Sequence, residues 1–211
     1  MTLLDNAIFI AQGIIITLQY TSGALLIGFT LGILLAIARY QGRCQFVIDS
    51  FVSIIRGTPM ILQLSFFYFA LPSLLNIRID IFTAGLITFG LNSAAYLSEI
   101  FRAGIESIPK GQFEAAKSLR IPSFYIWRDI IIPQVLKNVF PAIMNETITL
   151  VKETALVSVL GELDIMRRAQ TVAAQQFDYF VPICIAGACY YILVFSIEKL
   201  GKTIERRWQY A

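Results

Sequence analysis

The sequence predicts an all-α membrane protein with about five transmembrane helices, on the basis of its composition, its uncharged runs and the distribution of its positive charges. Of the 211 residues, 57% are hydrophobic and 15% are charged, and the mean hydropathy is +0.70. Soluble domains contain roughly 45–50% apolar and about 25% charged residues. Lipid is therefore the expected solvent. The chain is expected to form one transmembrane domain over 1–211, with no separate soluble domain.

The transmembrane helices are expected where the chain is apolar over the length that a bilayer requires. A helix needs about 20 residues to cross the hydrocarbon core. Five segments approach this length, at about 10–38, 54–77, 81–101, 138–160 and 179–200. The fourth is the weakest on hydropathy because it contains Glu146, Lys152 and Glu153.

The lysines and arginines predict how these spans are oriented. Thirteen of them fall after the first span, after the third span or in the C-terminal tail, and three fall on the other side. Because cytoplasmic loops are enriched in Lys and Arg, we expect the N-terminus outside and the C-terminus in the cytosol, in the inner (plasma) membrane. The acidic N-terminus is not typical of a cleavable signal peptide. Removing the fourth span would place the basic tail outside, so the same asymmetry supports that span.

Several classes of site lack their usual residues. The chain has no histidine, and Cys44, Cys184 and Cys189 form no CxxC pair, so neither a metal site nor a cofactor is expected. No GxxxxGK[ST] loop is present, so nucleotide chemistry would belong to a partner. A membrane-embedded enzyme has little support without a metal cluster or a GxSxG motif. No nucleic-acid partner is expected, and the lipid bilayer is the predicted environment.

The longest loop, 108–133, is expected on the cytosolic side. Pro109 and Gly111 indicate a turn at its start. Good helix formers then predict a short helix over 113–120, and a second helix is expected over 124–132. The loop is therefore predicted to form two short helices joined by an elbow.

The same loop is more apolar than a water-facing connection needs to be. Its apolar residues include Phe113, Leu119, Phe124 and Trp127. Exposed apolar patches of this kind usually indicate an interface. An amphipathic helix that rests on lipid headgroups accounts for the periodicity equally well.

The residues themselves favour the first of these interpretations. The loop begins with Glu114-Ala115-Ala116 and ends at Ile130–Pro133, with Arg120 in between. This pattern resembles the EAA loop of ABC importer permeases, which usually carries glycine where Arg120 stands. Five further motifs occur in the family's order: Arg56-Gly57-Thr58-Pro59, Leu91–Tyr96, Glu99–Arg102, Ile108–Gln112 and Lys152–Leu156. Together they resemble the permeases for polar amino acids of the histidine, glutamine and arginine type.

This resemblance implies a type I ABC importer permease fold with cytosolic coupling helices. In the family the EAA helix docks on an ATP-binding subunit, and this role carries over to Glu114, Ala115, Ala116 and Leu119. The implied partners are a pair of ATP-binding subunits, an extracytoplasmic amino-acid-binding protein and a second permease copy. Five spans are too few to enclose a solute path, so a homodimer or a heterodimer is expected.

Charged residues inside the membrane are the candidates for the solute path, because such residues usually face a cavity or a partner. Glu146 and Glu153 are seven residues apart and share a helix face. With the resemblance, which places substrate contacts in the third and fourth spans, the candidate substrate-binding residues are Asn92, Tyr96, Glu153, Thr154 and Asp164. Alternatively, Lys152 and Glu153 only fix helix packing. The spacing of Glu99, Arg102 and Glu106 favours an intrahelical ion network.

Two transport hypotheses follow. The first is the permease subunit of an ABC importer that moves a polar amino acid into the cytosol. Glutamine is slightly preferred because Lys152 partly offsets the charge of Glu153, and basic amino acids come next. The second is a secondary transporter or channel driven by an ion gradient; such folds often contain inverted repeats, and none is evident here.

Overall fold

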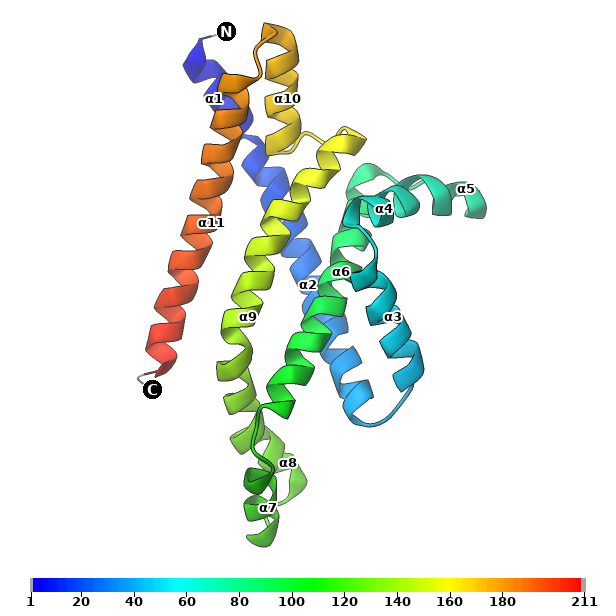
Figure 1. Ribbon diagram of the computed structural model, residues 1–211, viewed down its shortest axis with the longest axis vertical. Helices are drawn as coiled ribbons and strands as arrows, with labels where there is room; N and C mark the ends of the chain where they lie inside the picture. The colour runs from blue at the N-terminus through cyan, green and yellow to red at the C-terminus, as the bar shows by residue number, and fades with distance from the viewer. Residues whose placement is uncertain (1, 210–211) are drawn as a thin grey trace.

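The computed structural model describes residues 2–209, and within them the chain forms helices and turns with no strand, which confirms the all-α class. Its elements are α1 (Leu3–Ala11), α2 (Gly13–Tyr40), α3 (Gln45–Gly57), α4 (Met60–Ser65), η1 (Phe66–Ala70), α5 (Leu71–Leu75), α6 (Ile81–Glu106), α7 (Lys110–Ser118), α8 (Ser123–Tyr125), η2 (Ile126–Ile131), α9 (Ile132–Glu153), η3 (Thr154–Leu160), α10 (Ile165–Gln176) and α11 (Phe180–Gln209). Figure 1 shows an elongated bundle, with the N-terminus and α10 at one end and α7 and α8 at the other.

The lengths of these helices fit a chain that crosses a membrane several times. Within residues 2–209, three helical stretches are long and apolar enough to span a bilayer: Leu3–Tyr40, Ile81–Glu106 and Phe180–Arg207. A fourth candidate is the pair Gln45–Gly57 and Met60–Leu75, which meet at 105°. Helix α9 covers most of the predicted fourth span but is not among these candidates.

The predicted second span, 54–77, is not one straight helix, because the chain turns sharply at Thr58 and Pro59. Thr58 is extended (φ −114°, ψ 144°). A proline disfavours helical geometry in the residue before it and has no N–H to continue the helix. The side-chain amide of Gln63 donates to the Ile55 carbonyl at 2.7 Å and to the Thr58 carbonyl at 3.1 Å. This amide satisfies carbonyls at the end of α3 that the turn leaves without helical partners.

Helices α2 and α6 form the tightest contact in the bundle. Ala24, Gly28, Gly32 and Ala36 recur every four residues along α2, and all four are buried. A Cβ on Gly28 would lie 2.5 Å from the Ser93 Oγ of α6. Small residues at this spacing let two helix backbones approach closely in a membrane. The stripe therefore fixes α6 as the central helix, against which α3, α4 and α9 also pack.

Separate apolar clusters close the two ends of the bundle. At the N-terminal end, Ile10 of α1 packs against residues of α10 and α11, including Ile165 and Ala186. At the opposite end, Ala116 of α7 packs with Ile126, Ile131 and the start of α9. Helix α11 runs along the outside of α9 in Figure 1 and carries exposed apolar side chains such as Ile192 and Phe195.

Replacing Gly28 by leucine tests the close contact between α2 and α6. A larger side chain would collide with Ser93, so we expect destabilisation by about 1–3 kcal/mol, which is typical of an overpacked core. Thermal unfolding of the purified protein in detergent measures it. The matched control is Gly187→Leu on α11, where a Cβ would meet nothing within 4 Å. Equal loss of stability in the two variants would contradict the close-contact account.

Candidate functional site

A polar cleft of about 270 Å³ lies between α6 and α9. Helix α6 contributes Asn92, Tyr96 and Ile100, and helix α9 contributes Ala142, Asn145, Glu146, Thr149 and Glu153. The residues from α6 recur every four positions, and those from α9 recur every three or four. Each set therefore forms one face of its helix. The cleft exists because these two faces meet where α9 packs on the central helix.

Two carboxylates dominate the charge of this cleft. Glu146 is 9% exposed and Glu153 is half-buried. Across residues 2–209, no ion pair joins either carboxylate to a basic side chain, and Lys152 is exposed. Carboxylates in this setting are costly unless they face a cavity or a ligand. In the described part of the chain no ion pair of Lys152 or Glu153 supports the alternative that these two residues only fix helix packing.

An arginine lies beside the carboxylates. The guanidinium carbon of Arg56, at the end of α3, is 4.8 Å from the centroid of the Tyr96 ring, and its positive charge attracts Glu146. The turn at Thr58 and Pro59 directly follows Arg56, so the geometry of the turn also positions this guanidinium. Carboxylate and amide groups thus line the cleft, and the positive group of Arg56 lies at its edge, against the Tyr96 ring. Such a cleft can bind a small solute that carries both a cationic and an anionic group.

Three of the five predicted substrate-binding residues line the cleft, and two do not. Asn92, Tyr96 and Glu153 lie together there. Thr154 is fully buried at the start of η3, and its hydroxyl donates to the Val151 carbonyl at 2.7 Å. Its side chain points away from the cleft because it lies one helical position beyond Glu153, about 100° around the axis.

Asp164 is the second predicted residue that lies outside the cleft. It lies at the N-terminus of α10 and is 0% exposed. Its carboxylate accepts a hydrogen bond from the Arg167 N–H at 2.8 Å and another from the Tyr190 hydroxyl at 3.0 Å. Burial raises the pKa of Asp164, and these hydrogen bonds partly oppose the rise. The residue caps a helix and ties α10 to α11, so it is a structural residue and not part of the cleft.

The sequence interpretation missed Asn145, Glu146 and Thr149 as lining residues. The signal that could have found them was present, because Glu146 shares a helix face with Glu153. Extending that face by three or four residues at a time reaches Asn145 and Thr149 as well. The predicted residues were chosen from motifs of consecutive residues, whereas the residues that line the cleft are those on one face of α9.

The predicted docking residues lie on α7 or, for Leu119, directly after its last residue, at the end of the bundle away from the N-terminus. Glu114 and Ala115 are exposed, and Leu119 is 75% exposed. Ala116 differs, because it is 3% exposed and packs against the chain's own core. Three of the four residues are therefore accessible to a partner. Ala116 instead allows α7 to approach η2 and α9 closely.

The elbow after α7 is sharp despite its arginine. Arg120 adopts the left-handed conformation, with φ 55°. The Arg120 N–H donates to the Lys117 carbonyl at 2.9 Å, and the Ile121 N–H donates to the Ala116 carbonyl at 3.1 Å. This pair of bonds is a Schellman motif, in which glycine usually occupies the left-handed position. The backbone pattern of the turn is therefore retained with a residue that adopts it less readily.

The predicted ion network on α6 is present and extends further than expected. Arg102 pairs with Glu99 at 2.8 Å and with Glu106 at 2.7 Å. Arg39 of α2 also pairs with Glu99, and with Asp49 of α3 at 2.9 Å. The network therefore ties three helices together near α7.

Comparison with protein families matches residues 28–210 to the binding-protein-dependent transport system inner membrane component family. The chain belongs to this family. It is therefore a multi-pass inner-membrane permease component and not an enzyme, and it works in a system that includes a binding protein. A self-sufficient secondary transporter or channel was the wrong class.

Individual relatives of this permease component agree with the family match. It is 48% identical to the putative glutamine transport system permease protein of Rickettsia typhi, over 95% of this chain and 93% of the relative. It is 46% identical to the arginine transport system permease protein of Bacillus subtilis, over 94% and 92%. A solved amino acid ABC transporter with histidines matches with a TM-score of 0.90 and 36% identity, over 98% of this chain and all of the other. The fold is thus that of ABC importer permeases, as predicted.

Replacing Arg120 tests whether its left-handed conformation is strained. The left-handed region costs a residue with a Cβ roughly 1–2 kcal/mol relative to glycine. We expect Arg120→Gly to be more stable than the matched variant Arg120→Ala by about 1 kcal/mol, measured by thermal unfolding in detergent. An alanine variant as stable as the glycine variant would show that the turn has changed shape.

Replacing Asp164 separates its structural role from substrate binding. We expect Asp164→Ala to lose about 1–2 kcal/mol of stability with its helix cap, whereas Asp164→Asn retains a capping oxygen. Because the folded-state pKa is raised above the unfolded value, the wild type loses stability as the pH rises from the usual aspartate range to the raised pKa, and the asparagine variant does not. Unfolding measured against pH checks this. A changed substrate affinity in Asp164→Asn would contradict the structural assignment.

Proposed function

We propose that the chain is the permease subunit of an ABC importer that carries a polar amino acid into the cytosol, with glutamine preferred and basic amino acids next. The observation that carries this proposal is the cleft between α6 and α9. Its two unpaired carboxylates can hold an ammonium group, while Arg56 and the amides of Asn92 and Asn145 can hold a carboxylate. Every free amino acid presents both groups a short distance apart.

The charge balance of the cleft supports glutamine over a basic amino acid. Two carboxylates face the cleft, but Arg56 attracts one of them and Lys152 lies next to the other. A neutral side chain leaves no further charge to compensate. Relatives of similar identity are named for glutamine and for arginine, so both classes belong in the test.

The proposed arrangement places five spans in the membrane, with α9 as the fourth, the N-terminus outside and the C-terminus in the cytosol. It is supported by the basic loops and by the positions of α7 and the N-terminus at opposite ends of the bundle in Figure 1. Glu114 and Ala115 of α7, and Leu119 directly after it, then face the cytosol, where a pair of ATP-binding subunits docks and hydrolyses ATP. An extracytoplasmic amino-acid-binding protein delivers the solute at the α10 end, and a second permease copy completes the path.

The test pairs two variants that should fail in different ways. In proteoliposomes that contain the assembled transporter, Glu153→Gln removes a charged partner of the ammonium, and such a hydrogen bond is worth about 1.5–3 kcal/mol. We expect labelled glutamine uptake to fall at least roughly tenfold, while the ATP-binding subunit still co-purifies. Glu114→Ala should instead weaken co-purification of that subunit and lower uptake as a consequence.

The matched control is Glu198→Gln, which removes a carboxylate on α11 outside the cleft. It should leave uptake and co-purification near the wild-type level. Competition by unlabelled glutamine, arginine, lysine and histidine then ranks the substrates. The proposal fails if no ATP-binding subunit co-purifies with the wild type, or if uptake proceeds on an ion gradient without ATP.

A further inference from the structure

Two hollows share a wall at the end of the bundle that carries α7. One is a polar pocket of about 780 Å³ between α7 and the ends of α2 and α6. The other is an apolar groove of about 630 Å³ between α2, α6 and the start of α9. Ala36, Tyr40 and Ile105 line both. The pocket and the groove are therefore adjacent, and a ligand with one polar and one apolar part could reach across their shared rim into both.

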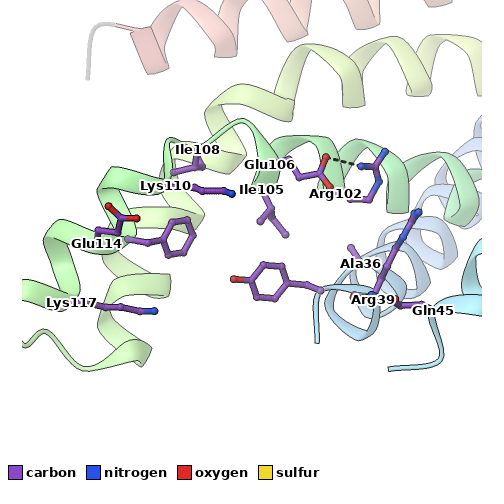
Figure 2. Close-up of a pocket in the computed structure, with 12 residues that line it drawn as sticks. Ala36, Arg39, Gln45, Arg102, Ile105, Glu106, Ile108, Lys110, Glu114 and Lys117 are labelled. Atoms are coloured by element: carbon purple, nitrogen blue, oxygen red, sulfur yellow. Dashed lines mark hydrogen bonds and ion pairs between the residues drawn. The ribbon is translucent and has the colours of Figure 1, made fainter. Parts of the chain in front are cut away.

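Two lysines carry the free positive charge of the polar pocket. Its arginines, Arg39 and Arg102, are already paired with carboxylates. Lys110 and Lys117 also line it, and no ion pair in the described part of the chain includes them. In Figure 2 their amino groups point from α7 toward α2, while the carboxylate of Glu114 points the other way. The pocket thus presents two cations to whatever enters it.

The groove is lined almost entirely by apolar side chains that remain open to their surroundings. Ile37 of α2 is 46% exposed, and Ile132 and Leu136 near the start of α9 are 46% and 43% exposed. The same surface belongs to a component of the inner membrane. An acyl chain fits such a groove, whereas a soluble anion or an acidic protein segment would leave it unfilled.

Aromatic side chains mark the junction of pocket and groove. The Trp127 ring lies 5.0 Å from Tyr40 and 5.6 Å from Phe113, centroid to centroid, both edge to face. Trp and Tyr are enriched at the level of lipid headgroups, because one end of each ring system is apolar and the other polar. The junction therefore has the composition of the membrane surface, with cations on one side and an apolar groove on the other.

We propose that the adjacent pocket and groove together bind an anionic phospholipid, with the phosphate between Lys110 and Lys117 and one acyl chain in the groove. Basic pockets between membrane helices are suited to such headgroups. The bound lipid would contact α2, α6, α7 and α9 at once and hold α7 at the membrane surface. This site requires only that the chain is a membrane component and does not depend on which solute is carried.

Native mass spectrometry of the delipidated, assembled transporter tests the proposal with phosphatidylglycerol and phosphatidylcholine of the same chain length. We expect phosphatidylglycerol to bind at least tenfold more tightly than phosphatidylcholine. The double variant Lys110→Gln/Lys117→Gln should weaken phosphatidylglycerol by roughly 30-fold, as expected when two lysines leave a charged surface. The matched control, Lys199→Gln/Lys202→Gln on α11, removes the same charge elsewhere and should bind as the wild type does.

A second arm tests the groove and distinguishes a lipid from a free anion. Leu136→Gln places a polar group in the groove at an exposed position, and it should weaken phosphatidylglycerol without changing thermal unfolding of the transporter. Glycerol phosphate, which has the phosphate without the acyl chains, should not bind detectably at the same concentration.

Four results would overturn the proposal. Equal binding of the two lipids would show that charge plays no part, and unchanged binding by the double lysine variant would place any lipid elsewhere. Tight binding of glycerol phosphate would identify a site for a soluble anion. Failure of phosphatidylglycerol to bind the assembled transporter would show that a protein contact covers the cavity.

Discussion

The close approach of α2 and α6 is the constraint on which the rest of the bundle depends. In lipid there is no hydrophobic driving force between helices, so their association depends on close van der Waals packing. The stripe of small residues that contains Gly28 and Gly32 allows this close packing. Helix α6 is then held at the centre, where it presents different residues to α2, α3 and α9. The polar cleft, the ion network around Glu99 and the junction beside Tyr40 all involve residues of α6 or lie against it.

Much of the architecture could be predicted from the sequence because lipid imposes strict requirements on a spanning helix. Uncharged runs of the required length located three spans, and the motif around Glu114 located the loop that carries α7. A continuous second span was predicted, but the structure has two helices that meet at 105°, because the chain turns at Pro59. Proline was visible in the sequence, but the direction of the bend depends on Gln63 and on packing against α6, which no local pattern encodes.

The cleft was only partly predictable because a motif consists of consecutive residues, whereas a helix face consists of residues three or four positions apart. Asn92, Tyr96 and Glu153 lie together in the cleft because they lie at matching heights on two adjacent helices. Thr154 follows Glu153 in the chain but points to another side, and Ala116 follows Ala115 but packs inward. Arg56 lies beside Tyr96 because of the turn that follows it in the chain. Its position could therefore be described only from the tertiary structure.

The start of α9 is fastened to α7 by reciprocal hydrogen bonds between the Gln112 and Gln134 amides, at 3.1 and 2.8 Å. From there α9 continues as one helix to Glu153, which is a length of about 30 Å at 1.5 Å per residue. A displacement of α7 would therefore also move the start of the helix that carries both cleft carboxylates. Pro141, between Gln134 and Glu146, cannot donate a helical hydrogen bond, so we expect α9 to bend there and to change its angle at the cleft when its start moves.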